Sequence, residues 1–136
     1  MSPYDLTDLI GIPFLSKGRD PLVGLDCWGM AMMTFRRFGH EVPDFDVACD
    51  DALKIGRNFN DELSSGRWTR IEEPEPGCGV AMAIDLRMPD FVQHFGVYVG
   101  GGKVIHTLRK VSSCTFSIHD SFWSRRVKGY YRWMDR

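Results

Sequence analysis

Three side chains of this 136-residue sequence could perform chemistry together: the thiol of Cys27 and the imidazoles of His94 and His106. A cysteine attacks an amide carbonyl well only as a thiolate, and a helix N-terminus or a neighbouring imidazolium lowers the pKa of the thiol. A histidine can take the proton of the thiol and later protonate the leaving amine, and a third polar group orients that histidine. The three residues are therefore candidates for a nucleophile, a base and an orienting group.

The residues around Cys27 predict that this thiol begins a helix. Asp26 is placed to be the N-cap, and Gly39 stands where a C-terminal cap belongs. Trp28, directly after the cysteine, could form a wall of the site. Apolar residues recur at intervals of three and four, as on the buried face of a helix, at Trp28, Ala31, Met32, Phe35 and Phe38.

A glycine turn at 100–102 joins the segment that carries His94 to the segment that carries His106. In an antiparallel hairpin, the two histidines are direct partners in one register and diagonal neighbours, about 7 Å apart, in the register two residues away. In the register one residue away from either of these, the two histidines lie on opposite faces of the hairpin. We predict a register that brings them to one face, because Phe95, Val97 and Val99 then form the apolar face opposite.

The other elements predicted from the sequence place helices before strands. A short helix is expected over 3–10, with Ser2 as N-cap and Gly11 as its stop, and a further helix around 50–57. The segment 72–77, rich in Pro and Glu, is a loop. Helices followed by strands predict an α+β domain, with the helix at Cys27 against one face of an antiparallel sheet. Its five β-prone runs are 80–86, 95–99, 103–108, 114–118 and 127–133.

Composition excludes several classes of protein. With 43% hydrophobic and 26% charged residues, the chain is expected to form a single domain over 1–136. A net charge of -1 gives no drive toward nucleic acid or an anionic membrane surface. The N-terminus lacks the pattern of a secretory signal and no apolar stretch is long enough to span a membrane, so we expect a chain made in the cytoplasm without membrane insertion.

Cysteines and histidines taken singly are more often structural than catalytic. No Cys-x-x-Cys pair suggests a zinc site, and we expect neither a metal nor a cofactor. Three cysteines and two histidines are interpreted as individual thiols and as surface imidazoles: Cys49, Cys78, Cys114, His40 and His119.

Three motifs resemble those of the NlpC/P60 family of cell-wall cysteine peptidases. Gly24–Gly29, which reads GLDCWG, resembles the nucleophile segment of the family. His94–Gly100 resembles its second motif, a histidine that leads a glycine-containing strand. Val104–His106 resembles the third, whose polar residue orients the histidine. The order and spacing agree, and the similarity is recognisable from about residue 9 to residue 133.

The resemblance implies a papain-like fold and hydrolysis of amide bonds in peptidoglycan stem peptides, with no metal or cofactor. In that reaction Cys27 attacks, His94 acts as acid and base, and His106 orients His94. The backbone N–H of Cys27 is the expected oxyanion donor. Two positions depart from the family pattern: Phe14 stands where members often carry a tyrosine near the oxyanion, and Cys78 follows the Pro-Gly step where an aspartate is usual.

The small size, the absent export signal and Trp28 after the cysteine more specifically resemble tail-associated wall peptidases of phages and prophages. This resemblance implies incorporation in a virion or phage-like tail, with stem peptides as substrates and tail-tip proteins as partners. Two alternatives stay open. One is a tail-assembly subunit that keeps the fold with little activity, and the other is a papain-like amidase or acyltransferase that acts on another substrate.

Overall fold

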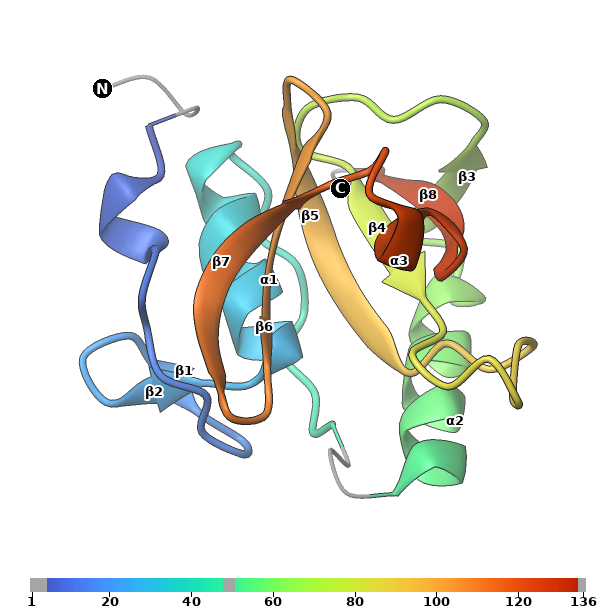
Figure 1. Ribbon diagram of the computed structural model, residues 1–136, viewed down its shortest axis with the longest axis horizontal. Helices are drawn as coiled ribbons and strands as arrows, with labels where there is room; N and C mark the ends of the chain where they lie inside the picture. Colours follow the sequence, from blue (N-terminus) through green and yellow to red (C-terminus); the bar gives the residue numbers. More distant parts are fainter. Residues whose placement is uncertain (1–4, 48–50, 135–136) are drawn as a thin grey trace.

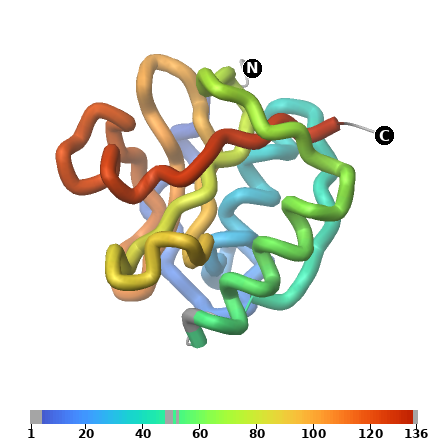
Figure 2. The backbone as a smooth tube through the Cα atoms, turned by 90° about the vertical axis from the view of Figure 1, so that its right-hand side faces the viewer, coloured from blue at the N-terminus to red at the C-terminus, as the bar shows by residue number. Residues whose placement is uncertain are grey.

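The computed structural model describes residues 5–47 and 51–134, which fold into helices packed on an antiparallel sheet. Figure 1 shows α1 (Cys27–Arg37) behind the sheet and α3 (Ser121–Ser124) in front of it. In Figure 2, turned by 90°, α1 and α2 (Ala52–Leu63) lie together on one side of the sheet. The predicted α+β class, with N-terminal helices on a C-terminal antiparallel sheet, is confirmed.

The main sheet has six strands in the order β3-β8-β4-β5-β6-β7, and every neighbouring pair is antiparallel. The last strand therefore returns to lie between β3 and β4. The N-terminal segment adds a 3-10 turn, Thr7–Leu9, and a two-stranded pair, β1 (Arg19–Asp20) and β2 (Gly24–Leu25). The strands of the main sheet are β3 (Trp68–Ile71), β4 (Gly79–Met82), β5 (His94–Gly100), β6 (Lys103–Leu108), β7 (Val111–Ser117) and β8 (Val127–Trp133).

Helix α1 begins and ends where the sequence predicts. The Asp26 side chain caps it by accepting a hydrogen bond from Gly29 N at 2.8 Å. The helix ends at Arg37, and Gly39 takes a left-handed backbone with φ of 80°, which glycine adopts without steric cost. The thiol of Cys27 therefore lies in the first turn of a capped helix.

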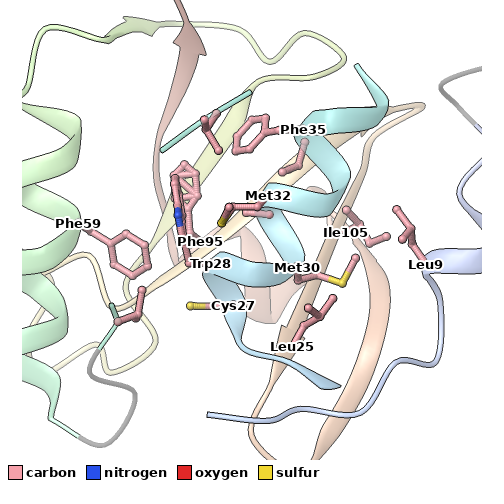
Figure 3. Packing of buried hydrophobic residues seen from close by; sticks show 14 of the residues in the cluster. Leu9, Leu25, Cys27, Trp28, Met30, Met32, Phe35, Phe59, Phe95 and Ile105 are labelled. Carbon is pink, nitrogen blue, oxygen red and sulfur yellow. The ribbon is translucent and has the colours of Figure 1, made fainter. Parts of the chain in front are cut away.

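The core lies between α1, α2 and the sheet, and an aromatic cluster forms its centre. Figure 3 shows Trp28, Phe59 and Phe95 meeting there from α1, α2 and β5. The Trp28 ring is fully buried, and its centroid lies 5.3 Å from that of Phe95 and 6.2 Å from that of Phe59. A smaller apolar cluster covers the opposite face of the sheet and consists of Val80, Met82, Val104 and Phe116.

Several element boundaries differ from those predicted. The helix expected around 50–57 runs from 52 to 63, because Ile55 and Phe59 are buried one turn apart and continue its apolar stripe. The first β-prone run ends at Met82 instead of 86. Of the helix expected over 3–10, the described part forms only the 3-10 turn, while Ser2 and Pro3 lie outside the described residues. The runs 103–108 and 127–133 match β6 and β8.

Replacing Gly29 by alanine is expected to destabilise the fold at the start of α1. A Cβ at this position would lie 2.4 Å from the carbonyl oxygen of Gly18, a backbone atom that cannot move without displacing the segment before β1. We expect Gly29→Ala to lower the free energy of unfolding by about 3 kcal/mol. Gly39→Ala is the control, because no atom lies within 4 Å of its Cβ position and only the left-handed backbone costs about 1 kcal/mol. Urea denaturation with equal losses in both variants would contradict this account of the helix start.

Candidate active site

The histidine pair is formed by the hairpin of β5 and β6. The register pairs Val97 with Ile105 and Tyr98 with Val104, which makes His94 and His106 diagonal neighbours on one face. His94 Nε2 and His106 Nδ1 lie 2.8 Å apart, within hydrogen-bond distance. The predicted register is therefore confirmed, in its diagonal form. The residues that alternate with the histidines on β5, Phe95 and Val97, are buried in the core beneath α1.

Burial keeps both imidazoles neutral. His94 is 2% exposed and His106 is 3% exposed. Burial, with a smaller effect from His106, lowers the pKa of His94 well below its usual value of 6.5, and burial lowers the pKa of His106 to about 4. In a neutral pair one ring donates N–H and the other accepts. If His94 donates through Nε2, its Nδ1 carries no proton and can act as a base. We assign this tautomer to His94, because its proposed role is that of the base.

Cys27 approaches the histidines from the other side of the sheet. It is 4% exposed and belongs to the core cluster beneath α1, whereas the histidine rings contact side chains on the α3 side. Figure 3 shows its sulfur directed away from the helix at the first turn. Helix α1 packs against β5 and β6, and His94 is the first residue of β5. A contact between Cys27 and His94 stays a prediction.

Asp26 has a structural role that its position as N-cap only partly indicates. Its carboxylate is fully buried and accepts hydrogen bonds from Gly29 N at 2.8 Å, Lys17 N at 3.2 Å and Arg19 Nη1 at 2.6 Å. Arg19 also binds Asp44 at 2.8 Å. Asp26 therefore fastens the segment before β1 to the start of α1. With no exposed surface, it is not placed to line a substrate groove.

The pKa values of both members of this ion pair are raised, for different reasons. Burial raises the pKa of Asp26 against the effect of the Gly29 N–H and the Arg19 charge. Burial lowers the pKa of Arg19, but its hydrogen bond to Asp44 and the charge of Asp26 outweigh this effect. The pKa of Arg19 is therefore raised. The Asp26 side chain has no exposure, whereas that of Arg19 keeps 22%, so the desolvation cost falls mainly on the carboxylate. Three donors around the carboxylate favour the ionised form, and we treat the pair as charged.

Trp28 and Phe14 differ in their surroundings. Trp28 is fully buried, and its indole N–H donates to Pro43 O at 3.0 Å, which suits a core residue and not a wall open to substrate. Phe14 forms a β-bridge with Leu25, close in sequence to Cys27. Its ring is half-buried, with the Arg109 guanidinium carbon 5.8 Å from the ring centroid. No hydroxyl is available at this position.

The remaining cysteines differ from Cys27 in their surroundings. Burial raises the pKa of the Cys78 thiol to about 11 and raises that of Cys114. Neither thiol is therefore prepared to act as a nucleophile at neutral pH. Cys114 is the Cα partner of His106 on β7. Cys49 lies outside the described residues.

Two residues near the site have no clear signal in the sequence. Arg19 is seven positions before its carboxylate partner, outside any predicted element. Trp123 lies on α3, which the sequence does not predict, and its ring centroid is 4.9 Å from that of His106 and 6.2 Å from that of His94. An aromatic residue next to an Asp-Ser helix start is too weak a pattern to assign to a site.

Neither a metal centre nor a membrane span is seen among the residues that the structure describes. Over 5–47 and 51–134, no three His, Cys, Asp or Glu side chains are grouped so that they could hold a metal ion. No helix in these ranges has the length and hydropathy needed to cross a membrane.

Comparison with known proteins gives concordant results. The sequence model described as the NlpC/P60 family matches residues 11–132. A curated relative, the gamma-D-glutamyl-L-lysine dipeptidyl-peptidase of Bacillus subtilis (strain 168), is 26% identical over 98 residues, which cover 72% of this chain. The match spans only 28% of that relative's length.

Solved structures show the same fold at low sequence identity. An NlpC/P60 family protein from Bacillus cereus ATCC 10987 has a TM-score of 0.65 and 21% identity, over 98% of this chain and 41% of that one. NlpC2 from Trichomonas vaginalis has a TM-score of 0.67 and 18% identity, over 97% and 45% of the two chains. The NlpC/p60 domain of the peptidoglycan hydrolase SagA has a TM-score of 0.61 and 19% identity, over 93% and 91%.

Removing the cation beside Asp26 is expected to destabilise the protein strongly. Arg19→Met leaves a fully buried carboxylate without its ion pair, which costs about 3–5 kcal/mol in comparable cases. The loss should shrink as the pH falls, because Asp26 can then bind a proton in place of the cation. Arg36→Met is the matched control, since Arg36 and its partner Glu41 are 48% and 72% exposed and the pair should contribute at most about 1 kcal/mol. Urea denaturation at pH 7 and pH 5 measures both effects, and similar losses in the two variants would refute the role of Asp26.

Proposed function

The chain belongs to the NlpC/P60 family of peptidoglycan hydrolases and peptidases, and on that premise we propose that it is a cysteine hydrolase that cleaves amide bonds in peptidoglycan stem peptides. One observation carries the proposal. The second and third motifs meet in a hydrogen-bonded histidine pair, on the two strands against which the helix of the first motif packs. Three short motifs that are separate in sequence thus belong to adjacent elements of one fold.

The proposed reaction follows from the neutral state of the pair. As the Cys27 sulfur attacks the amide carbonyl, His94 Nδ1 takes the thiol proton. His94 then gives this proton to the leaving amine, and a water molecule that His94 deprotonates hydrolyses the thioester. His106 holds the His94 ring by its hydrogen bond. Because burial penalises an imidazolium here, we favour a neutral thiol and imidazole before attack over a preformed ion pair.

The proposed substrate class is a peptide with a γ-D-glutamyl amide bond. The Bacillus subtilis relative is named for gamma-D-glutamyl-L-lysine dipeptidyl-peptidase activity, and its match covers 72% of this chain but only 28% of its own length. The backbone N–H of Cys27, at the N-terminus of α1, is the proposed donor to the oxyanion. Phe14 would contribute a ring and no second donor.

The proposed setting is a phage or phage-like tail, where a wall hydrolase acts during genome delivery and tail-tip proteins are its partners. The resemblance of the GLDCWG segment, with Trp28 after the cysteine, supports this setting. Incorporation in a virion would bring a protein made in the cytoplasm to the cell wall.

A second candidate function is a tail subunit of the same fold with little activity. Two observations favour it: Cys27, His94 and His106 are each less than 5% exposed, and Phe14 lacks a hydroxyl. A substrate could reach these three side chains only if covering groups moved. Turnover of wall fragments distinguishes the two candidates, since a structural subunit would bind without cleaving.

Muropeptides incubated with the purified protein should be cleaved at an amide bond, with new termini visible by mass spectrometry. Cys27→Ala should abolish this cleavage, and His94→Ala should slow it by about 10²–10⁴-fold. His106→Asn should retain more activity than His106→Ala, because an amide can still hydrogen bond to His94. Cys78→Ala is the control thiol and should leave the rate unchanged. Full activity in Cys27→Ala would remove Cys27 from the mechanism, and an inactive parent that still binds muropeptides would favour the structural subunit.

The acid limb of the pH profile should lie below 6.5. The folded-state pKa of His94 is lowered from 6.5, so its basic form persists as the pH falls through that value. The unfolded chain binds protons at its histidines near pH 6.5 while the folded pair does not, so stability should also decrease as the pH falls below 6.5. Measuring kcat/KM between pH 4 and 8, with a circular dichroism spectrum at each pH, distinguishes loss of the basic form of His94 from unfolding. An acid limb at or above 6.5 would argue against a dry, neutral pair.

A further inference from the structure

Two aromatic rings cover the histidine pair on the α3 side of the sheet. Phe116 of β7 and Trp123 of α3 are stacked, with centroids 4.6 Å apart and planes 18° apart. Trp123 lies 4.9 Å from His106 at 89° and 6.2 Å from His94 at 33°. Phe116 lies 4.8 Å from His106. The indole of Trp123 thus packs against both imidazoles at distances typical of aromatic pairs.

The position of Trp123 is fixed although α3 has only four residues. The Asp120 carboxylate accepts hydrogen bonds from Phe122 N at 2.9 Å and Trp123 N at 3.2 Å. Arg126 donates to the backbone oxygen of Phe122 at 2.8 Å and to Ile84 O at 3.1 Å, and neither hydrogen bond needs the Phe122 ring. These contacts tie α3 to the segment after β4, which leads along the chain to His94. The indole is therefore held against the pair by polar contacts outside the aromatic cluster.

The hydrogen bond between His94 and His106 is vulnerable to water. Two neutral imidazoles form it with one donor and one acceptor, and a water molecule can replace the partner at either ring. Replacement would free His94 to rotate or to change tautomer, and Nδ1 would then no longer be fixed as the proton acceptor. The half-buried Trp123 side chain lies between the deeply buried pair and the outer surface of α3.

We propose that Trp123 is a positioning residue for the hydrolysis proposed above. Its indole excludes water from the hydrogen bond between His94 and His106 and holds the His94 ring in one orientation. It acts through the two histidines and not by contact with substrate. The inference rests on the proposed function for its catalytic consequence, whereas the effect on the imidazoles can be measured without any substrate.

Three variants separate the ring from the helix that carries it. Trp123→Ala removes the cover, and Trp123→Phe keeps an aromatic ring. Phe122→Ala is the matched control: it removes a neighbouring ring of α3 that is 47% exposed and packs on Trp123 and Arg126. If Trp123→Ala does not fold by circular dichroism, Trp123→Leu replaces it.

The ring nitrogens of ¹⁵N-histidine-labelled protein, followed by NMR as a function of pH, report directly on the pair. We expect Trp123→Ala to let water in and to move the pKa of at least one imidazole up toward 6.5, while Trp123→Phe stays close to the parent. The other ionisable groups on the surrounding elements are Cys27, Arg36 and Arg37 on α1, Tyr98 on β5, Lys103 on β6, Cys114 on β7, and Asp120, Arg125 and Arg126 flanking α3. None of these groups is altered in the variants.

The kinetic readout uses a γ-D-glutamyl stem peptide. Trp123→Ala should lower kcat by about ten- to a hundredfold with KM changed less than about twofold, as expected when a reacting group is misplaced and substrate binding is kept. Trp123→Phe should recover most of kcat. Phe122→Ala should match the parent in kcat and in ¹⁵N shifts.

The outcomes distinguish this inference from the proposed function. An active parent with unchanged kcat and ¹⁵N shifts in folded Trp123→Ala would overturn the positioning role and leave the hydrolase intact. A Phe122→Ala variant as impaired as Trp123→Ala would overturn it too, since the effect would then belong to α3 as a whole. If the parent is inactive while Trp123→Ala still changes the imidazole titration, the proposed function fails and the protection of the pair by Trp123 stands.

Discussion

The ion pair between Arg19 and the fully buried Asp26 is the interaction on which the arrangement of the site depends. One carboxylate caps α1, receives the backbone N–H of Lys17 and holds a guanidinium that also binds Phe45 O. The start of α1 is thereby joined to the segments on either side of it in space. Cys27 is the next residue after the cap, so its thiol cannot shift without disturbing this group of contacts. A buried charge is costly, and its retention suits a structure that must fix one position accurately.

The two faces of the sheet have different surroundings. On the α1 side, β5 contributes Phe95 and Val97 to an aromatic core. On the other side, His94 and His106 form a dry hydrogen-bonded pair against Phe116 and Trp123. Strand alternation makes this division possible, because successive residues of one strand point to opposite faces. Both rings are removed from water, which lowers their pKa values and favours their neutral forms.

The match covers 28% of the Bacillus subtilis relative and 91% of a SagA structure that is itself described as a domain, so this fold occurs as part of longer chains. Burial of Cys27, His94 and His106 makes access the main physical question for a polymeric substrate.

Local patterns in the sequence determined the capped helix at Cys27, the shared face of the two histidines and two strands, because capping, turn glycines and alternation act over a few residues. The family resemblance supplied the fold on which these pieces are mounted. Tertiary structure alone decided the rest: Trp28 is a core residue, Asp26 is bound by Arg19, α2 runs on to Leu63, and Trp123 covers the histidines. Each of these depends on contacts between segments distant in sequence or on a helix too short to leave a periodic pattern. Burial also set the neutral state of the imidazoles, which residue types and spacing cannot show because it arises from the surrounding packing.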